Sequence, residues 1–419
     1  MDFRIFTRAF KHPAILSLII FLSVMGPGII TANVDNDAGG ITTYSLAGSQ
    51  FGYDILWLFI PMIIALAVIQ EMGVRMGIVS GKGLADLIRE KVGIRLTFVM
   101  MVALLLANFG NILAEFSGIA VSSGILFNAP RFIALPVAAL FVWLLVVKGN
   151  YKSVEKVFLL ASTLYLSYIV AGYLSNPDWG LAAKSLLVPH ISANPAYITM
   201  VVGVVGTTIA PWMMFYIQSS VVEKGVSLRN LKYSKVDAIF GAVVVNIVAF
   251  FIVLACATTI FTTGIQVNDV ADVSRALAPL AGQYASILFA LGFLNASLFA
   301  ASILPLSTAY YVCESLGFEA GISKSFREAP IFHGMYLGLI LLAVIIIMFP
   351  NVPLLSILYL SQVANGILLP FVLILMLLII NDKRIMGEYV NSKLFNLIAW
   401  ITVIIVMALS IGLLITNIL

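Results

Sequence analysis

The chain has 419 residues, of which 62% are hydrophobic and only 10% are charged, and its formal net charge is +4. A soluble globular domain typically carries about 25% charged residues, so this composition excludes one and indicates an all-α polytopic membrane protein. The basic residues lie in short segments between apolar runs and form no basic patch, so we expect no nucleic-acid partner.

Apolar runs of about 20 residues or more predict about eleven transmembrane helices within a single transmembrane domain, residues 1–419. No cleavage site follows the basic amino-terminal segment, so we interpret the first run as a span and not as a removed signal peptide. The runs occupy residues 14–48, 55–78, 96–127, 132–147, 157–174, 197–222, 238–261, 285–313, 335–349, 354–380 and 394–418.

The distribution of the 23 Lys and Arg residues predicts the orientation. When the segments between spans are assigned alternately to the two sides, all but Arg131, Lys184 and Arg275 fall on one side. By the positive-inside rule the amino terminus is cytoplasmic, and an odd number of spans places the carboxyl terminus outside. We expect a multi-pass protein of the plasma (cell inner) membrane.

The first run, which includes GPGIITANVDNDAGGITTYSLAGSQFG (26–52), carries acidic residues inside an apolar segment. Asp35, Asn36 and Asp37 stand in a row, and carboxylates at membrane depth usually line a pathway or a site. Gly39 and Gly40 let the backbone leave helical geometry, so we predict a helix broken there, near the bilayer midplane. Its freed carbonyls and carboxylates would converge on a cation. The alternative is a loop between two helices with the acids in water.

The sixth run is interrupted at residues 207–211, within GVVGTTIAPW (203–212). Pro211 lacks an amide hydrogen and frees carbonyl groups around Thr207, which can then face a ligand. The alternative is a simple proline kink.

The starts of the two interrupted helices are five spans apart. An odd number of spans per repeat inverts the second copy and puts a binding site between the two broken helices. We therefore predict a leucine-transporter-like fold with inverted repeats of five helices, about 14–174 and 197–380, and an extra helix at about 394–418.

Five segments carry a family resemblance. They are GPG at 26–28, DAGG at 37–40, AGSQFGY at 47–53, LAE at 113–115 and SQV at 361–363. They resemble the GPG, DPGN and AGAQFGY sequences and the third- and tenth-helix motifs of the natural-resistance-associated macrophage protein (NRAMP) family of divalent-metal transporters. The chain resembles the NRAMP-related magnesium transporter branch of that family more closely. The resemblance spans nearly the whole chain.

The departures from the family pattern concern the metal ligands. The family pairs its DPGN acid and asparagine with a methionine thioether on the sixth helix; here Asp37 keeps the acid, but Gly40 and Ala210 stand at the other two positions. A thioether is a soft ligand that favours manganese, iron or cadmium, whereas magnesium prefers oxygen and usually keeps several waters. We therefore expect a roomier, oxygen-lined site that suits a hydrated magnesium ion. Asp35 and Asn36 would supply outer contacts or merely face a vestibule.

Polar amides on the tenth and third spans allow two interpretations. Gln362 matches the family's substrate-facing glutamine, and Asn365 lies on the same helical face, so both are candidates for the site or its water shell. Amides at membrane depth also join helices to one another, and this is the interpretation we favour for Asn108 and Asn111.

The residues of the family's proton route are largely replaced. Its histidine corresponds to Trp212, whose indole only donates, and the acid three positions before Glu115 corresponds to Ile112. Glu115 itself is either a remaining pathway acid or an acid paired within the bundle. We therefore expect no proton coupling.

No phosphate loop or catalytic set indicates an enzyme, and no cofactor or obligate protein partner is expected. We predict a secondary transporter that moves hydrated divalent cations, Mg²⁺ and also Mn²⁺, across the lipid bilayer by alternating access. The alternatives are a proton-coupled Mn²⁺/Fe²⁺ transporter of the ordinary NRAMP type, a symporter of a small organic substrate on the same scaffold, and a channel.

Overall fold

The computed structural model describes residues 26–147, 156–157, 159–161, 163–264, 267 and 283–418, and every regular element among them is helical. The first interrupted helix and the helices after it lie in the first half of the chain. They are α3 (Pro27–Val34), α4 (Ala38–Phe51), the 3-10 helix η1 (Gly52–Leu58), α5 (Phe59–Ser80), α6 (Leu84–Val92), α7 (Ile94–Phe127), α8 (Arg131–Val147), η2 (Thr163–Tyr165), α10 (Leu166–Leu174) and α11 (Trp179–Leu187).

The second half begins with the other interrupted helix. Its elements are α12 (Pro195–Thr208), α13 (Pro211–Glu223), η3 (Leu228–Asn230), α14 (Leu231–Cys256), the π-helical turn η4 (Ala257–Phe261), α16 (Gln283–Leu316), α17 (Pro330–Met348), α18 (Leu354–Ile380), α19 (Lys383–Met386), η5 (Gly387–Tyr389) and α20 (Lys393–Ile418). Helical structure coincides with the described part of every predicted span; residues 14–25 of the first span and residues 158 and 162 of the fifth lie outside the described residues. Within the described ranges, eight helical segments are long and apolar enough to cross a membrane, and two shorter apolar helices accompany them.

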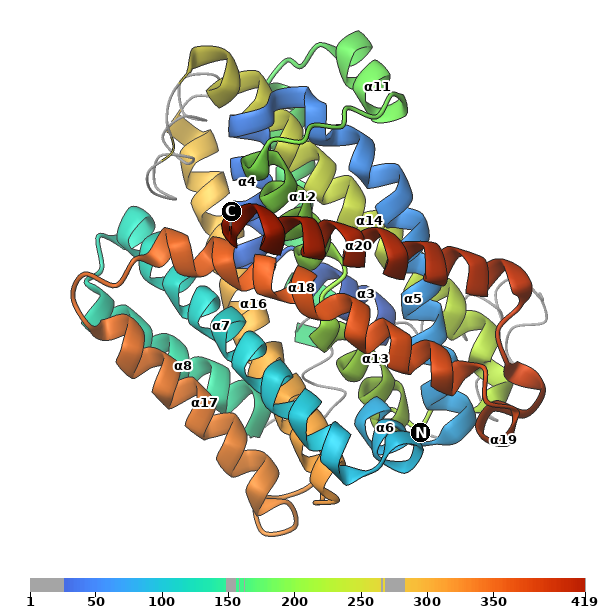
Figure 1. The fold of residues 1–419 in the computed structure, drawn as a ribbon. Coiled ribbons are helices and arrows are strands. Elements are labelled where there is room, and N and C mark those ends of the chain that lie inside the picture. The colour runs from blue at the N-terminus through green and yellow to red at the C-terminus, as the bar shows by residue number, and fades with distance from the viewer. Residues whose placement is uncertain are drawn as a thin grey trace, which may run out of the picture.

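The helices form two groups that are joined by a crossing pair (Figure 1). Helices α7, α8, α16 and α17 pack together on one side, and α14 packs against α3, α4 and α5 on the other. Helices α18 and α20 lie side by side across the face of the molecule, and α18 contacts both α7 and α12. Both broken helices are therefore enclosed by other helices.

Small residues bring α12 and α18 into direct backbone contact. A Cβ atom at Gly206 would lie 2.2 Å from the carbonyl oxygen of Gln362, and one at Gly366 would lie 2.5 Å from that of Val202. Close approach of this kind is the usual way in which helices associate in membranes, because burial of apolar surface between helices provides no driving force in lipid. It places Gln362 beside the end of α12.

The amino terminus of α3 is capped by a side chain from a distant helix. The Asp237 carboxylate on α14 accepts hydrogen bonds from the amides of Gly28 at 2.7 Å, Gly26 at 3.3 Å and Ile29 at 3.4 Å. The first amides of a helix have no partner within the helix, and a carboxylate there also complements the helix dipole. Asp237 therefore joins α3 to α14, a role that no local sequence signal indicates.

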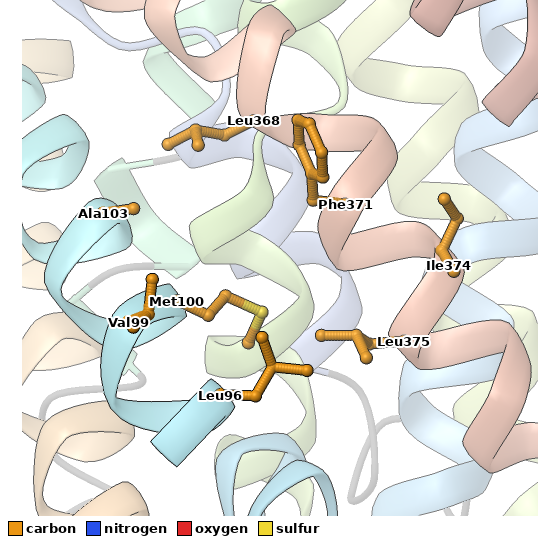
Figure 2. Close-up of a pocket in the computed structure, with 8 residues that line it drawn as sticks. All are labelled: Leu96, Val99, Met100, Ala103, Leu368, Phe371, Ile374 and Leu375. Carbon is orange, nitrogen blue, oxygen red and sulfur yellow. The ribbon is translucent and has the colours of Figure 1, made fainter. Parts of the chain in front are cut away.

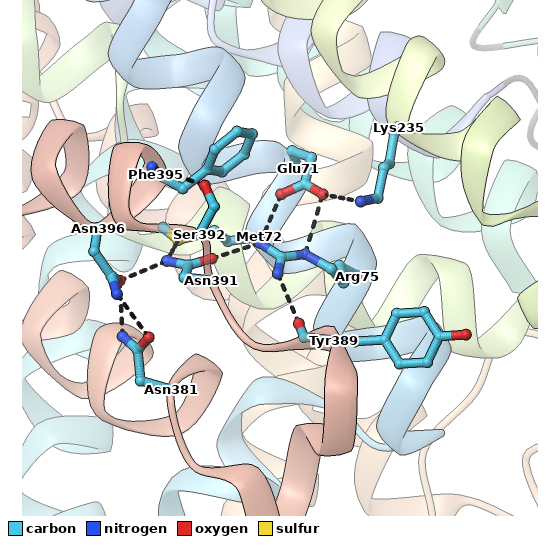
Figure 3. Close-up of polar contacts among 10 residues, drawn as sticks. All are labelled: Glu71, Met72, Arg75, Lys235, Asn381, Tyr389, Asn391, Ser392, Phe395 and Asn396. Atoms are coloured by element: carbon cyan, nitrogen blue, oxygen red, sulfur yellow. Dashed lines mark hydrogen bonds and ion pairs between the residues drawn. The ribbon is translucent and has the colours of Figure 1, made fainter.

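A buried polar cluster joins α5 and α14 to the connection before α20 (Figure 3). Arg75 on α5 forms an ion pair with Glu71 at 2.9 Å, and Lys235 on α14 contacts Glu71 at 2.7 Å. The Arg75 guanidinium also donates to the Tyr389 carbonyl at 2.7 Å and to the Asn391 side chain. The spacing of Glu71 and Arg75, four residues apart on one helix, is the sequence signal for part of this cluster.

Candidate cation site between the broken helices

The first helix breaks at Asp35–Asp37, before the two glycines. Helix α3 ends at Val34, Asp37 has an extended backbone, and α4 begins at Ala38. Asp37 is the N-cap of α4, because its Oδ1 accepts a hydrogen bond from the Gly40 amide at 2.6 Å. The prediction that the glycines unwind the helix was wrong: Gly39 and Gly40 belong to the first turn of α4, and the preference of aspartate for the N-cap position determines where that helix starts.

The glycines instead allow other groups to approach closely. A Cβ atom at Gly40 would lie 2.4 Å from the Asp35 carbonyl oxygen, 2.9 Å from Thr207 Oγ1 and 3.2 Å from Asp37 Oδ1. Three oxygen atoms surround the position that a side chain of residue 40 would take, so the glycine itself leaves no open space there, and the roomier site expected from Gly40 and Ala210 together stays a prediction. A Cβ atom at Gly39 would lie 2.0 Å from Gln362 Nε2, so the Gln362 side chain packs against the first turn of α4.

The second helix breaks at Ile209–Ala210, between α12 and α13, as predicted. Pro211 occupies the first turn of α13, where its missing amide hydrogen costs nothing, and Ala210 has an extended backbone without a side-chain cap. Thr207, in the last turn of α12, donates from Oγ1 to the Asp35 carbonyl at 3.5 Å. This contact joins the two breaks directly.

Two carboxyl groups meet the amino terminus of α4. Glu115 on α7 accepts a hydrogen bond from the Ala38 amide at 3.2 Å, and Asp37 accepts one from the Gly40 amide of the same turn. Glu115 thus lies beside the break, with no basic side chain bonded to it among the described residues.

Several buried oxygen atoms at the first break have no hydrogen-bond donor among the described residues. They are both carboxylate oxygens of Asp35, Oδ1 of Asn36 and Oε1 of Glu115. Asn36 is held by its other atom, because its amide donates to the Val245 carbonyl on α14 at 3.2 Å. Buried acceptors without partners are rare in proteins and costly, and a cation or water would satisfy them.

Side-chain amides of α18 and α7 form one continuous chain of hydrogen bonds that ends at a hydroxyl group of α16. Asn365 donates to Gln362 Oε1 at 3.0 Å and exchanges hydrogen bonds of 3.1 Å with Asn111, and Asn111 donates to Asn108 at 3.2 Å. Asn108 continues to Thr308 on α16 at 2.6 Å. The predicted joining role of Asn108 and Asn111 is confirmed, and Gln362 and Asn365 form the end of the chain nearest to α4.

Trp212 lies in the first turn of α13 and is buried, and its carbonyl oxygen accepts a hydrogen bond from Ser307 on α16 at 3.2 Å. No group of three or more His, Cys, Asp or Glu side chains that could hold a metal ion occurs among the described residues. A cation at the breaks would therefore be bound by a few side-chain oxygens together with backbone carbonyls and water.

A family profile described as natural resistance-associated macrophage protein-like matches residues 28–416 of the chain. The divalent metal cation transporter MntH of Deinococcus radiodurans is 26% identical over 402 residues, covering 93% of this chain and 88% of its own length. MntH of Bacillus subtilis is 24% identical over 404 residues, with coverages of 94% and 92%.

Solved structures share the fold. A mutant of the Eremococcus coleocola manganese transporter superposes with a TM-score of 0.79 at 20% identity, covering 93% of this chain and 85% of that chain. MhsT in complex with L-phenylalanine superposes with a TM-score of 0.63 at 13% identity, with coverages of 93% and 97%. The predicted leucine-transporter-like fold is confirmed by these similarities.

Proposed function

The chain belongs to the natural resistance-associated macrophage protein-like family, and we propose that this multi-pass membrane protein transports divalent metal cations. The MntH relatives, whose names state that activity, support the assignment. The observation that carries it is the convergence of oxygen atoms at the first break: the Asp35 carbonyl, the Asp37 carboxylate and the Thr207 hydroxyl surround one position beside Gly40.

Within that class, we propose a preference for hydrated Mg²⁺, with Mn²⁺ as a second substrate. Hard cations take oxygen ligands, and magnesium usually keeps several of its waters and binds through one or two carboxylates. Ala210 offers no thioether at the second break, so softer ions such as Cd²⁺ gain no sulfur ligand there. Asp37 would be the principal ligand and the Thr207 hydroxyl a neutral one, while Gln362, whose Oε1 accepts from Asn365 and whose Nε2 faces Gly39, would donate to the water shell of the ion.

The proposed mechanism is alternating access around the two breaks. In inverted-repeat transporters the substrate lies between two discontinuous helices, and one group of helices rocks against the other. We assign the repeats to residues of about 14–174 and 197–380, so that α3–α4 and α12–α13 are equivalent elements. The direct contact between Thr207 and Asp35 supports a single shared site.

Uptake into proteoliposomes that contain the purified chain tests this function. We expect uptake of Mg²⁺ and Mn²⁺ that saturates and competes, with weak uptake of Cd²⁺ and Ca²⁺. Uptake of an amino acid without any divalent cation would favour an organic-substrate symporter and would refute the proposal. Ion currents orders of magnitude above carrier turnover would instead show a channel.

We further propose that metal entry is not coupled stoichiometrically to protons, because Trp212 and Ile112 replace the relay groups. One observation favours the second candidate, a proton-coupled Mn²⁺/Fe²⁺ transporter: the acid Glu115 remains, and its carboxyl group lies at the start of α4, beside Asp37. A pH-sensitive dye inside the vesicles distinguishes the two. Acidification that follows metal influx in a fixed ratio would establish coupling, and a constant pH supports uncoupled transport.

We propose that the amino terminus is cytoplasmic and that the protein resides in the plasma membrane. Helices α6 and α19, which carry Lys91 and Lys383, lie at one end of the molecule, and α11, which carries Lys184, lies at the other (Figure 1). The positive-inside rule makes the first end cytoplasmic. Reporter fusions at the α16–α17 and α10–α11 connections test the orientation. We expect the α16–α17 connection in the cytoplasm and the α10–α11 connection outside. A reporter at the α16–α17 connection that proved external would refute this orientation.

A further inference from the structure

A groove of about 400 Å³ lies between α7 and α18 (Figure 2). Leu96, Met100 and Ala103 of α7 face Leu368, Phe371 and Leu375 of α18, and all of its lining residues are apolar. Asn111 and Asn365, whose amides join the same two helices, lie beyond one end of this stretch in both sequences. The groove therefore begins where the polar contact between α7 and α18 ends.

The walls of the groove are exposed on the surface of the molecule. Val99 is 65% exposed and Phe371 is 58% exposed, although both are large apolar residues. The volume falls within the range of roughly 300–1,000 Å³ that is usual for small-molecule sites. In a protein that spans a bilayer, an open apolar groove of this size suits a hydrocarbon chain.

Basic residues lie where the groove approaches the ends of its two helices. Arg95, next to Leu96, is exposed and has no hydrogen bond or ion pair with any described residue. Lys383 begins α19, just after α18 ends, and is likewise exposed and without an ion-pair partner in the described part of the chain. An ion pair of 2.5 Å between Lys91 and Asp382 draws the start of α7 and the end of α18 together.

The nearby carboxylate does not neutralise these two cations. Hydrogen bonds from Arg384 and Lys91 hold the pKa of Asp382 well below its ordinary range, so this carboxylate is ionised at neutral pH and is already shared by two partners. Arg95, adjacent in the chain to the lining residue Leu96, and Lys383, adjacent to Asp382, therefore leave unpaired positive charge near this end of the apolar groove. This combination complements an acyl chain that carries an anionic head group.

We propose that the groove between α7 and α18 binds an anionic phospholipid, with one acyl chain between the helices and its phosphate at Arg95 and Lys383. Basic pockets between transmembrane helices on the cytoplasmic side bind anionic head groups, which are abundant in that leaflet. A chain in this position separates α7 and α18 directly beside the amide contacts that hold Gln362. The binding itself does not depend on which ion is transported.

Native mass spectrometry of the purified full chain tests the proposal, with dioleoyl phosphatidylglycerol and dioleoyl phosphatidylcholine as the probes. We expect phosphatidylglycerol to bind more tightly. Each basic residue near the membrane surface changes the affinity for an anionic lipid about fivefold. Arg95→Gln should therefore weaken phosphatidylglycerol binding about fivefold, and adding Lys383→Gln should weaken it about fivefold again. Ala103→Phe, which fills the groove, should weaken the binding of both lipids.

Two substitutions outside the groove serve as controls. Arg327→Gln removes an exposed charge from the α16–α17 connection, and Val137→Phe adds the same ring to a lipid-facing position of α8 that is 62% exposed. Neither should change lipid binding. Equal affinity for both lipids, or unchanged phosphatidylglycerol binding by Arg95→Gln and Ala103→Phe, would overturn the proposal. If the chain proved to be a dimer and Ala103→Phe dissociated that dimer, the groove would bind a second copy of the chain. This result would also overturn the lipid proposal.

Discussion

At the scale of single residues, Asp35 and Asp37 differ in how the protein supports them. Asp37 caps α4 and receives the Gly40 amide, whereas neither carboxylate oxygen of Asp35 has a donor among the described residues. Leaving an ionised group unpaired in a buried environment costs several kcal/mol. A bound cation between the two breaks would offset that cost, so we expect both acids to matter for ion binding.

Asp37→Asn should reduce cation uptake to the level of empty vesicles while leaving the fold intact. Asparagine is as good an N-cap as aspartate, so the substitution removes the charge and keeps the cap of α4. Uptake of Mg²⁺ at equal membrane expression is the measurement. Asp54→Asn is the matched control, since the Asp54 side chain is 56% exposed in η1, and it should transport normally. Normal uptake by Asp37→Asn would refute the site.

Ala210→Met should shift the preference from Mg²⁺ towards Mn²⁺ and Cd²⁺. The extended backbone of Ala210 imposes no strain on a larger residue, although the side chain is buried, and a thioether at the second break supplies a soft ligand while displacing water that magnesium keeps. Competition uptake with the three ions measures the shift. Ala210→Leu adds similar bulk without sulfur, so it should lower Mg²⁺ uptake without improving Cd²⁺ binding. Equal Cd²⁺ binding by both variants would show that residue 210 does not face the ion.

At the scale of elements, the site depends on how α4 begins. Asp37 fixes the first turn of α4, Glu115 accepts its Ala38 amide, and the glycines admit the Asp35 carbonyl and the Gln362 side chain. Amides at a helix start normally attract negative charge. Here the Glu115 and Asp37 carboxylates accept hydrogen bonds from amides in the first turn of α4, so this helix can start inside the molecule, away from water.

Gly40→Ala should weaken cation binding at least tenfold, because the added methyl group would collide with the Asp35 carbonyl and push the first turn of α4 away from Thr207. Isothermal calorimetry with Mn²⁺ measures the change. Gly334→Ala on α17 is the matched control: no atom lies within 4 Å of its Cβ position, so binding should be unchanged and the helix slightly more stable. Equal Mn²⁺ affinity of both variants would contradict the proposed geometry.

The sequence predicted the spans and both breaks well, because long apolar runs and isolated carboxylates are local features. The first break was predicted in the right stretch but assigned to the glycine pair, although aspartate is a preferred N-cap residue and Asp37 could have been recognised as the start of α4. The cap that Asp237 provides could not be predicted, since it depends on residues that are distant in sequence. The amide chain from Gln362 to Thr308 was predicted only in part, because sequence spacing shows one helix face at a time.

At the scale of the whole molecule, the buried cluster around Arg75 connects the group that contains α5 and α14 with the last helix, α20 (Figure 3). Glu71 and Arg75 have side-chain exposures of only 3% and 6%. We expect α20 to follow the movements of α5 and α14 during transport, since separating them would remove the hydrogen bonds from the buried Arg75 guanidinium to the Tyr389 carbonyl and to Asn391.

Arg75→Ala should destabilise the protein by about 3 kcal/mol, the lower end for breaking a buried ion pair, because Lys235 still neutralises Glu71. Thermal unfolding in detergent measures the loss. Arg384→Ala is the control, since this side chain is 84% exposed and its ion pair with Asp382 lies at the surface, where such pairs contribute little. Indistinguishable unfolding temperatures for the two variants would show that the cluster does not hold α20 in place.

The cap on α3 has a consequence for the order of synthesis. Gly28 and Asp237 are separated by 209 residues, so the ribosome completes α3 long before it makes the carboxylate that caps it. At roughly 5–20 residues per second, the delay is on the order of 10–40 seconds. During that interval the uncapped amides of α3 must be satisfied by other groups, such as lipid head groups or water at the translocon. The first broken helix therefore receives its amino-terminal cap only after α14 has been made, and the ion site is completed late in biogenesis.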